Sequence, residues 1–146
     1  MNCFACDRIA QIKSNCNPYF VSELEASYLV LADHQRYEGW CILLLKEHHE
    51  HLDQLPFEAQ LLLFRDVARA ARAVRSTFHP QRLNYECLGN SISHIHWHII
   101  PRYDWDPQPE SPIWVRPKEE RYVGVSPERL SGLVADLKRH LNNERA

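Results

Sequence analysis

A run of histidines in strict alternation with apolar residues constrains the fold of this chain more than any other feature. Residues 94–98 read His-Ile-His-Trp-His, within a segment of strand length at residues 93–101. Successive side chains of a β-strand point to opposite faces. The pattern therefore predicts a strand with its histidines in a row about 13 Å long on one face and an apolar face packed into a core. Imidazoles held in this way can bind a metal ion or take part in nucleophilic and acid–base chemistry.

The flanking segments predict an α+β domain. Short apolar runs bounded by polar turns are typical of strands, and longer amphipathic runs are typical of helices. The expected strands cover residues 19–22, 28–31, 40–45, 83–88 and 93–101, and the expected helices cover residues 57–78 and 126–141. This order favours a five-stranded, mainly antiparallel sheet with one long helix packed on it and a C-terminal helix.

The two expected helices carry different signals. In the long helix, Phe57, Leu61 and Phe64 belong to a set of apolar residues that recur at helical spacing, and polar residues that include Asp66 populate the other side. The C-terminal helix opens at Ser126, because serine is a favoured N-cap residue and an apolar stripe follows it.

Residues 102–146 are expected to form a C-terminal arm and helix that complete a single domain of residues 1–146. The stretch between residues 101 and 127 is rich in proline and aromatic residues and has no clear period. We interpret it as an ordered loop, because its large apolar side chains would need burial. These side chains are Trp105, Ile113, Trp114 and Val115.

The composition excludes several classes of function. A net charge of -2 argues against a broad electrostatic grip on nucleic acid. Residues 1–7 lack the features of a secretory signal, and no apolar run approaches the roughly 20 residues of a membrane helix. The 5 cysteines are an odd number, which favours reduced thiols. We therefore expect a cytoplasmic protein with no nucleic-acid or membrane partner.

The histidine segment and its surroundings resemble the signature of the histidine triad family of nucleotide hydrolases and transferases. Residues 89–102 read Gly-Asn-Ser-Ile-Ser-His-Ile-His-Trp-His-Ile-Ile-Pro-Arg, and the family pattern is histidine alternating with apolar residues. Residues 45–52 and 83–85 are also similar to family segments, so the resemblance covers roughly residues 3–102. It implies a small-molecule nucleotide substrate and a homodimer that pairs through the long helix and a neighbouring strand.

The resemblance also implies a role for each residue of the motif. The middle histidine, His96 here, would attack the α-phosphorus and form a nucleotidyl-imidazole intermediate that water then cleaves. A main-chain carbonyl of the same strand would orient its other ring nitrogen, and His98 would hydrogen-bond the leaving group or the phosphate oxygens. The implied substrate contacts are Asn90 and Ser91 to phosphate, Asn84 on the previous strand, and Asp33 to the ribose hydroxyls.

Several positions depart from the family pattern. Asn90 stands where glutamine is more frequent, and its side chain is shorter by one carbon–carbon bond, about 1.5 Å. Trp40 stands where many members have a histidine, and Leu45 replaces a common proline. Residues 104–122 lie beyond the signature, which makes them candidates for substrate specificity.

A possible metal site involves Cys3 and Cys6, whose spacing lets both thiolates reach one ion. The spacing alone is also compatible with two free cysteines. Some bacterial family members bind structural zinc through such a pair and two histidines, and two thiolates with two imidazoles suit tetrahedral zinc. The implied ligands are Cys3, Cys6, His48 and His94. We interpret His49 and His51 as exposed loop residues, although either could replace His48.

Three functions remain open from the sequence. The first, favoured by the resemblance, is a nucleotidyl hydrolase or transferase acting on dinucleoside polyphosphates, nucleoside phosphoramidates or similar compounds. The second is a metal-dependent enzyme or metal-binding module with all three histidines as ligands, although alternate residues on a flat strand lie about 6–7 Å apart, which is wide for one ion. The third is a non-catalytic nucleotide-binding module on the same fold.

Overall fold

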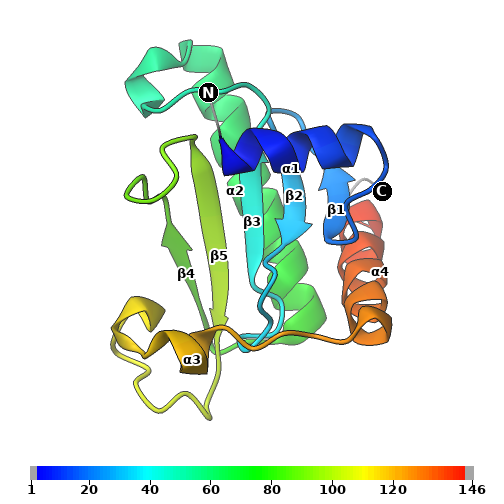
Figure 1. Cartoon of the computed structure of the whole chain (residues 1–146), viewed down its shortest axis with the longest axis vertical. Helices are drawn as coiled ribbons and strands as arrows, with labels where there is room; N and C mark the ends of the chain where they lie inside the picture. The colour runs from blue at the N-terminus through cyan, green and yellow to red at the C-terminus, as the bar shows by residue number, and fades with distance from the viewer. Residues whose placement is uncertain (1–2, 144–146) are drawn as a thin grey trace.

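The computed structural model describes residues 3–143 and is built on a five-stranded antiparallel sheet (Figure 1). The strand order is β1-β2-β3-β5-β4, so the histidine strand β5 lies between β3 and β4. The strand bounds are Phe20–Glu23 for β1, Ser27–Leu31 for β2, Cys41–Leu45 for β3, Arg82–Glu86 for β4 and His96–Arg102 for β5. With helices packed on this sheet, the expected α+β class is confirmed.

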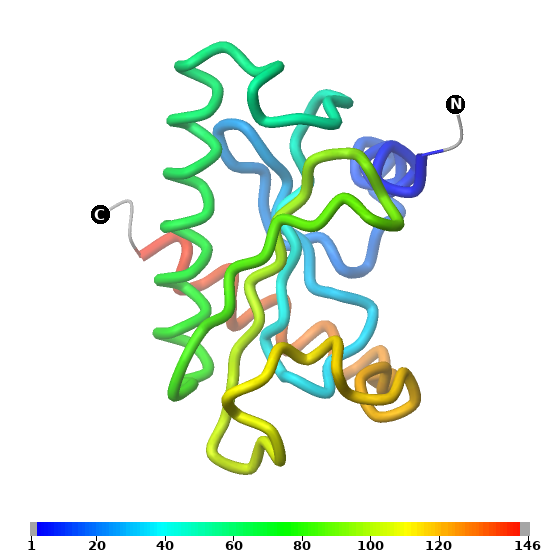
Figure 2. The backbone as a smooth tube through the Cα atoms, turned by 90° about the vertical axis from the view of Figure 1, so that its left-hand side faces the viewer, coloured from blue at the N-terminus to red at the C-terminus, as the bar shows by residue number. Residues whose placement is uncertain are grey.

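Two long helices, α2 and α4, cover one face of the sheet (Figure 2). Helix α2 has the expected bounds, and α4 begins at the expected cap, where the Ser126 hydroxyl accepts a hydrogen bond from the Arg129 amide at 3.2 Å. The helix bounds are Phe4–Lys13 for α1, Phe57–Phe78 for α2, Lys118–Arg121 for α3 and Pro127–Asn143 for α4, with 3-10 helices η1 at Leu52–Gln54 and η2 at Ile113–Val115. Within residues 3–143 no helix has the length and apolar character needed to cross a membrane.

The buried face of α2 is not the one expected. The side chains of Phe57, Leu61 and Phe64 are 68%, 44% and 54% exposed. The helix instead turns a face with several alanines, among them Ala70 and Ala73, toward the sheet and α4. Small side chains let the helix axis lie close to its neighbours, so this face packs more tightly than the aromatic one would. The expected stripe was therefore wrong at Phe57, Leu61 and Phe64, whereas its later members Ala71 and Val74 are buried, and α2 keeps an exposed apolar surface.

Asp66, expected on the polar side of α2, is only 2% exposed. Its carboxylate accepts hydrogen bonds from the backbone amides of Glu25 at 3.1 Å and Ala26 at 2.8 Å, and from the hydroxyl of Ser27 at 2.8 Å. A buried carboxylate is stable when its oxygens are satisfied in this way. Asp66 therefore ties α2 to the turn between β1 and β2.

The opposite face of the sheet is covered in part by α1, which the sequence reasoning did not identify. Its buried residues Ala5, Ile9 and Ile12 pack against Tyr28 and Leu44 of the sheet. The helix has no side-chain hydrogen bond at its N-cap, and several of its apolar residues, Ala5, Cys6 and Ala10, are small. The usual helix signals were thus missing. This helix brings the N-terminal cysteines to the sheet.

The arm after β5 covers the same face farther along the strand. Ile113 is fully buried and Trp114 is partly buried, as expected, because both join a cluster around Ile100 of β5. The expected burial of Trp105 and Val115 was wrong, since both are exposed. The Trp105 ring is instead stacked on the rings of Tyr37 and Tyr103, which shields its flat faces without enclosing its edge.

Strand β5 begins at His96 rather than at residue 93. The regular ladder with β3 ends at the pair of Leu44 and His96. Beyond it the Ile95 carbonyl accepts from the Leu45 amide at 3.2 Å, but the Ile95 amide donates to the His49 carbonyl at 2.8 Å. His94 therefore lies just before the strand, with its ring fully buried. The three histidines follow one another as expected, but only His96 and His98 belong to the regular strand.

Candidate functional site

The His96 ring is held by the backbone of its own segment. Its Nδ1 lies 2.7 Å from the carbonyl oxygen of His94. A carbonyl oxygen can only accept, so Nδ1 carries the hydrogen and Nε2 keeps its lone pair. Nε2 has no hydrogen-bond partner within residues 3–143. Although His96 is only 7% exposed, it lines a pocket, so this lone pair is available to a bound molecule.

The His98 ring has the opposite assignment, imposed by Trp40. The indole Nε1–H of Trp40 donates to Nδ1 of His98 at 3.1 Å. Since an indole nitrogen can only donate, Nδ1 is the acceptor and Nε2 of neutral His98 carries the hydrogen. Burial, with a smaller effect from His96, lowers the pKa of His98 from 6.5 to about 4. His98 is therefore a neutral hydrogen-bond donor at pH 7, 5.1 Å from His96 between ring centroids.

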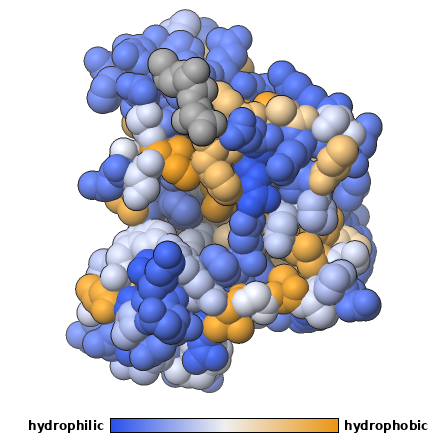
Figure 3. Space-filling view, viewed as in Figure 1, coloured by the Kyte–Doolittle hydropathy of each residue, from blue (hydrophilic) through white to orange (hydrophobic). Residues whose placement is uncertain are grey.

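The two rings open into a pocket of about 480 Å³. Its walls come from α1, from β3, from the loop between β4 and β5, and from the arm after β5. Figure 3 shows this face of the molecule hollowed between the α1 side and the α3 side. The lining residues are Phe4, Ala5, Ile42, Leu44, Leu88, Asn90, Ser91, Ile92, His96, His98, Trp114, Arg121 and Tyr122. The pocket is thus mainly apolar, with a few polar groups near the histidines.

The other predicted substrate residues divide into two groups. Asn90 and Ser91 line the pocket with the histidines. Asn84 does not, since its Oδ1 accepts a hydrogen bond from Arg102 at 2.7 Å and it lines a different cavity. Asp33 lies outside the pocket lining and forms an ion pair with Arg8. The expected roles of all four residues stay predictions.

The sequence reasoning missed most of the pocket wall supplied by the arm. Residues 104–122 were candidates for substrate specificity as a segment, and Trp114 was interpreted as a packing residue or a ring that could stack on a base, but nothing in the sequence singled out Arg121 or Tyr122. In the fold all three face the histidines from a segment that follows β5 by more than ten residues. Only the return of the arm across the sheet brings them there, and no local spacing could have revealed it.

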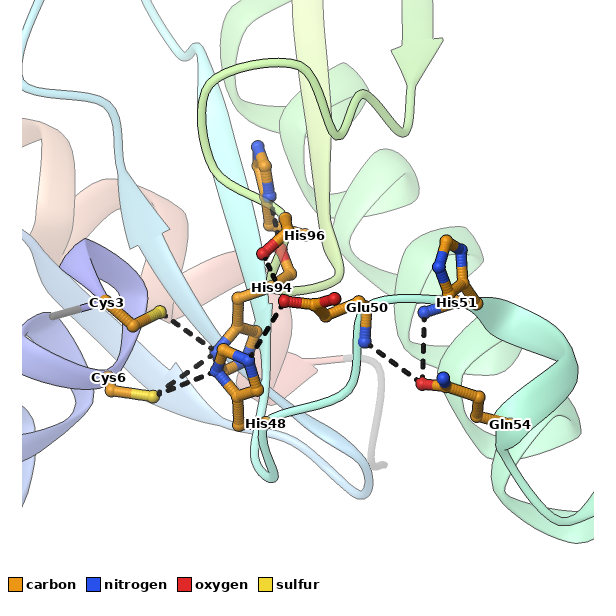
Figure 4. A network of polar contacts seen from close by, with 9 residues as sticks. Cys3, Cys6, His48, Glu50, His51, Gln54, His94 and His96 are labelled. Carbon is orange, nitrogen blue, oxygen red and sulfur yellow. Dashed lines mark hydrogen bonds and ion pairs between the residues drawn. The ribbon is translucent and has the colours of Figure 1, made fainter. Parts of the chain in front are cut away.

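A second cluster joins α1 to the segment before β5 (Figure 4). The Sγ atoms of Cys3 and Cys6 lie 3.6 and 3.5 Å from Nδ1 of His94, and Sγ of Cys6 lies 3.4 Å from Nδ1 of His48. One ligand atom from each of these residues lies within 4.8 Å of all the others. Tetrahedral bonds of about 2.3 Å to sulfur and 2.0–2.1 Å to nitrogen would place such atoms roughly 3.5 Å apart. The cluster therefore has the donor set and dimensions of a metal site.

A neighbouring carbonyl orients one of the two imidazoles of this cluster. The carbonyl oxygen of Leu45 lies 2.8 Å from Nε2 of His94, so Nε2 carries the hydrogen and Nδ1 presents a lone pair to the cysteines. Support of this kind is usual around metal-binding histidines. Nε2 of His48 lies 3.7 Å from a carboxylate oxygen of Glu50, beyond hydrogen-bond distance, and has no hydrogen-bond partner within residues 3–143. His49 and His51 are not part of the cluster, as expected.

Comparison with known proteins identifies the family. A family model for the HIT domain matches residues 14–105. This range includes all five strands of the sheet, together with His96 and His98. The chain belongs to the histidine triad family. The Bacillus subtilis protein named hit is 34% identical over 107 residues, covering 70% of this chain and 72% of the relative. The family consists of nucleotide-binding hydrolases and transferases, the general kind of protein to which this chain belongs.

Solved structures of other histidine triad proteins share the fold. A zinc-bound family protein from Mycobacterium smegmatis superposes with a TM-score of 0.70 at 21% identity, covering 99% of this chain and 96% of that one. Diadenosine triphosphate hydrolase from Plasmodium falciparum superposes with a TM-score of 0.65 at 15% identity, covering 88% of this chain and 80% of that one. At sequence identities this low, the similarity to these two structures shows a shared fold and nothing more.

The hydrogen bond from Trp40 generates a test based on pH. The pKa of His98 is about 4 in the folded chain and 6.5 without the fold, so between these values the unfolded chain binds more protons. The stability contributed by neutral His98 is complete above pH 6.5 and is lost as the pH falls toward 4, about 2 kcal/mol of it by pH 5. In Trp40→Phe the Nδ1 lone pair is free for a proton. We expect the pKa of His98 to rise and the loss of stability between pH 7 and pH 5 to shrink.

NMR titration of His98 and urea unfolding at the two pH values measure these effects. Trp105→Phe is the matched control, because it removes an indole from the exposed ring stack and leaves His98 untouched. An unchanged His98 titration in Trp40→Phe would contradict the assigned hydrogen bond.

Proposed function

We propose that the chain cleaves a phosphoanhydride or phosphoramidate bond of a nucleotide through a covalent nucleotidyl intermediate on His96. The observation that carries the proposal is the fixed state of the His96 ring. Its Nδ1–H is bound to the His94 carbonyl, and its Nε2 lone pair lies in a pocket. A neutral imidazole is a suitable nucleophile for phosphorus, because it avoids the repulsion that an anionic nucleophile meets at a negatively charged phosphate.

The proposed reaction has two steps. Nε2 of His96 attacks the α-phosphorus, and the bond from phosphorus to the leaving group breaks. The positive charge that develops on the ring is stabilised by the His94 carbonyl at Nδ1. The Nε2–H of His98 donates a hydrogen bond to the departing atom, and an amine leaving group takes up its additional proton from solvent. In the second step water attacks the phosphorus and releases a proton to solvent, the nitrogen–phosphorus bond breaks, and the nucleoside monophosphate leaves with neutral His96 restored.

The remaining polar groups have supporting roles in this proposal. Asn90 and Ser91 would contact phosphate oxygens, which their position in the pocket lining supports. Asp33 would hold the ribose only by exchanging its ion pair with Arg8 for the hydroxyls. Asn84 would reach the nucleotide only by leaving Arg102. The hydrolase from Plasmodium falciparum, named for diadenosine triphosphate, supports a dinucleoside polyphosphate as one class of substrate.

The alternative in which all three histidines bind one metal ion has less support. Nδ1 of His94 faces the cysteines and its Nε2 faces the Leu45 carbonyl, so His94 has no nitrogen left for a shared ion with His98. The donor from Trp40 likewise occupies Nδ1 of His98. A non-catalytic nucleotide-binding module on the same fold is an outcome that the following experiment would reveal.

The first test is His96→Ala. The variant lacks the nucleophile, so we expect turnover of diadenosine tetraphosphate and of adenosine 5′-phosphoramidate to fall by about 10³-fold or more. Folding and nucleotide binding should remain. Rapid quenching followed by mass spectrometry should detect the nucleotidyl adduct on His96 in the wild-type chain.

His79→Asn serves as the control for this test. His79 is an exposed histidine in the left-handed conformation at the end of α2, which asparagine tolerates, and it is not among the residues that line the pocket. Equal hydrolysis by His96→Ala and the wild type would refute the mechanism. A wild type that binds nucleotide and turns over neither substrate would identify the non-catalytic module.

We also propose that Cys3, Cys6, His48 and His94 hold a structural zinc ion. The interatomic distances and the zinc-bound relative from Mycobacterium smegmatis support this assignment. When bound, the ion would supply no reactive group to the pocket, and its effect would be to pin α1 against the segment before β5. Burial and the neighbouring Cys3 raise the pKa of the Cys6 thiol in the metal-free cluster, so zinc binding should release protons.

Metal analysis of untagged protein tests the zinc proposal. We expect about one zinc ion per chain, and Cys3→Ser should remove most of it and lower the Tm by roughly 5–10 °C, which corresponds to a few kcal/mol. Cys16→Ser is the matched control, because Cys16 is exposed and outside the cluster. Protein without zinc whose Tm does not respond to chelator would end the proposal.

We further propose a homodimer that uses the exposed apolar surface of α2, formed by Phe57, Leu61 and Phe64. Sedimentation should show a dimer, and Leu61→Glu should shift it toward monomer, because a buried unpaired charge opposes association. Ser76→Glu, an exposed change near the other end of α2, should leave the dimer intact. A wild-type monomer at all concentrations would contradict this proposal.

The five free cysteines support a reducing compartment such as the cytoplasm.

A further inference from the structure

The arm after β5 places a cation beside the histidine pocket. The Trp114 ring contacts His98 edge-on, with 5.6 Å between ring centroids, and also contacts Trp40 at 5.8 Å. On Trp114 lies the guanidinium of Arg121, 5.2 Å from the ring centroid, and the same guanidinium lies 4.9 Å from the centroid of Tyr122. Arg121 is thus separated from His98 by one indole ring.

Arg121 differs from the other arginines of the arm and its surroundings. Arg102 binds Asp106 and several oxygens, Arg116 binds Glu120, and Arg129 binds Glu38. Arg121 has no carboxylate or hydrogen-bond partner within residues 3–143, and its Nε is buried without an acceptor. Aromatic rings hold its plane and leave its Nε–H without an acceptor. An unsatisfied buried donor is costly, so it favours a ligand that accepts from it.

The pocket around Arg121 has no charge of its own to neutralise it. Among the lining residues of the described chain, Arg121 is the single lysine or arginine, and no carboxylate is present. A partly buried guanidinium facing such a pocket attracts an anion, and the planar fork of donors fits a phosphate group.

The position of Arg121 also indicates which phosphate it would bind. It approaches the site over Trp114, which contacts His98, the residue proposed to serve the leaving group. Asn90 and Ser91, by contrast, lie on the loop that leads into the nucleophile segment. Arg121 is therefore placed for a charge on the leaving group rather than on the phosphorus under attack.

Resting on the proposed function, we propose that Arg121 makes the pocket selective for substrates whose leaving group carries phosphate. Dinucleoside polyphosphates satisfy this requirement, because their leaving group is a nucleotide with further phosphates. Nucleoside phosphoramidates do not, because their leaving group is an amine. Arg121 is thus the determinant that separates two substrate classes which His96 could attack equally well.

A comparison of the two substrate classes tests the proposal. For Arg121→Gln, the ratio of kcat/KM for diadenosine tetraphosphate to kcat/KM for adenosine 5′-phosphoramidate should fall by about 10- to 100-fold, the usual effect of one charge-assisted hydrogen bond. Arg121→Lys should recover part of this ratio, since it keeps the charge and loses the planar fork. Arg129→Gln, which removes an arginine outside the pocket lining, should leave the ratio at its wild-type value.

Binding measurements test the role of Arg121 independently of the proposed cleavage by His96. In a His96→Ala background, Arg121→Gln should weaken binding of diadenosine tetraphosphate by about 10-fold or more and binding of AMP by a much smaller factor. Added salt should weaken the first complex less in the variant than in its parent. If the wild type hydrolyses neither substrate, the proposed function fails, and this binding comparison still decides the role of Arg121.

Each other outcome overturns the proposal. Equal losses for both substrates, or for diadenosine tetraphosphate and AMP, would assign Arg121 to the phosphate under attack. No loss in any measurement would show that Arg121 only supports the fold of the arm. A wild type that prefers the phosphoramidate would also refute selection for a phosphorylated leaving group.

Discussion

The residue on which the rest of the site depends is His94. Its ring nitrogens face the cysteines and the Leu45 carbonyl, and its backbone carbonyl accepts from Nδ1 of His96. One residue therefore takes part in the cysteine–histidine cluster with its side chain and orients the proposed nucleophile with its backbone. Any displacement of His94 would move the carbonyl that sets the tautomer of His96. This arrangement links the cysteine–histidine cluster directly to the His96 ring in the pocket.

Strand β5 supports this arrangement because it is paired on both sides. β3 and β4 fix its backbone, while Trp97 and Ile99 anchor its other face in the core with α2 and α4. The positions of the imidazole rings are therefore fixed by the backbone of the strand. A regular strand also explains the division of roles, since His96 and His98 share one face and His94, just before the strand, turns to the cysteines.

The pocket itself is made by two additions to the sheet, α1 on one side and the arm on the other. Phe4 and Ala5 form part of one wall, and Trp114 and Tyr122 form part of the opposite wall. Trp40, where many family members have histidine, reaches the same region. Its indole N–H donates a hydrogen bond to Nδ1 of His98 and, unlike a histidine nitrogen, cannot act as an acceptor. The walls of the pocket are thus built largely from segments outside the strand that carries His96 and His98.

The α+β class, the bounds of α2, the place of the histidine strand and the cysteines and histidines that meet near α1 could all be predicted from the amino-acid sequence and its family motif. These features follow from local periodicity and from a motif in which neighbouring residues act together. The tertiary structure alone decided which side of α2 is buried, why Asp66 lies inside, and that Arg121 faces His98 across Trp114. Those outcomes depend on how distant segments pack, and packing is a property of the whole chain that no local pattern contains.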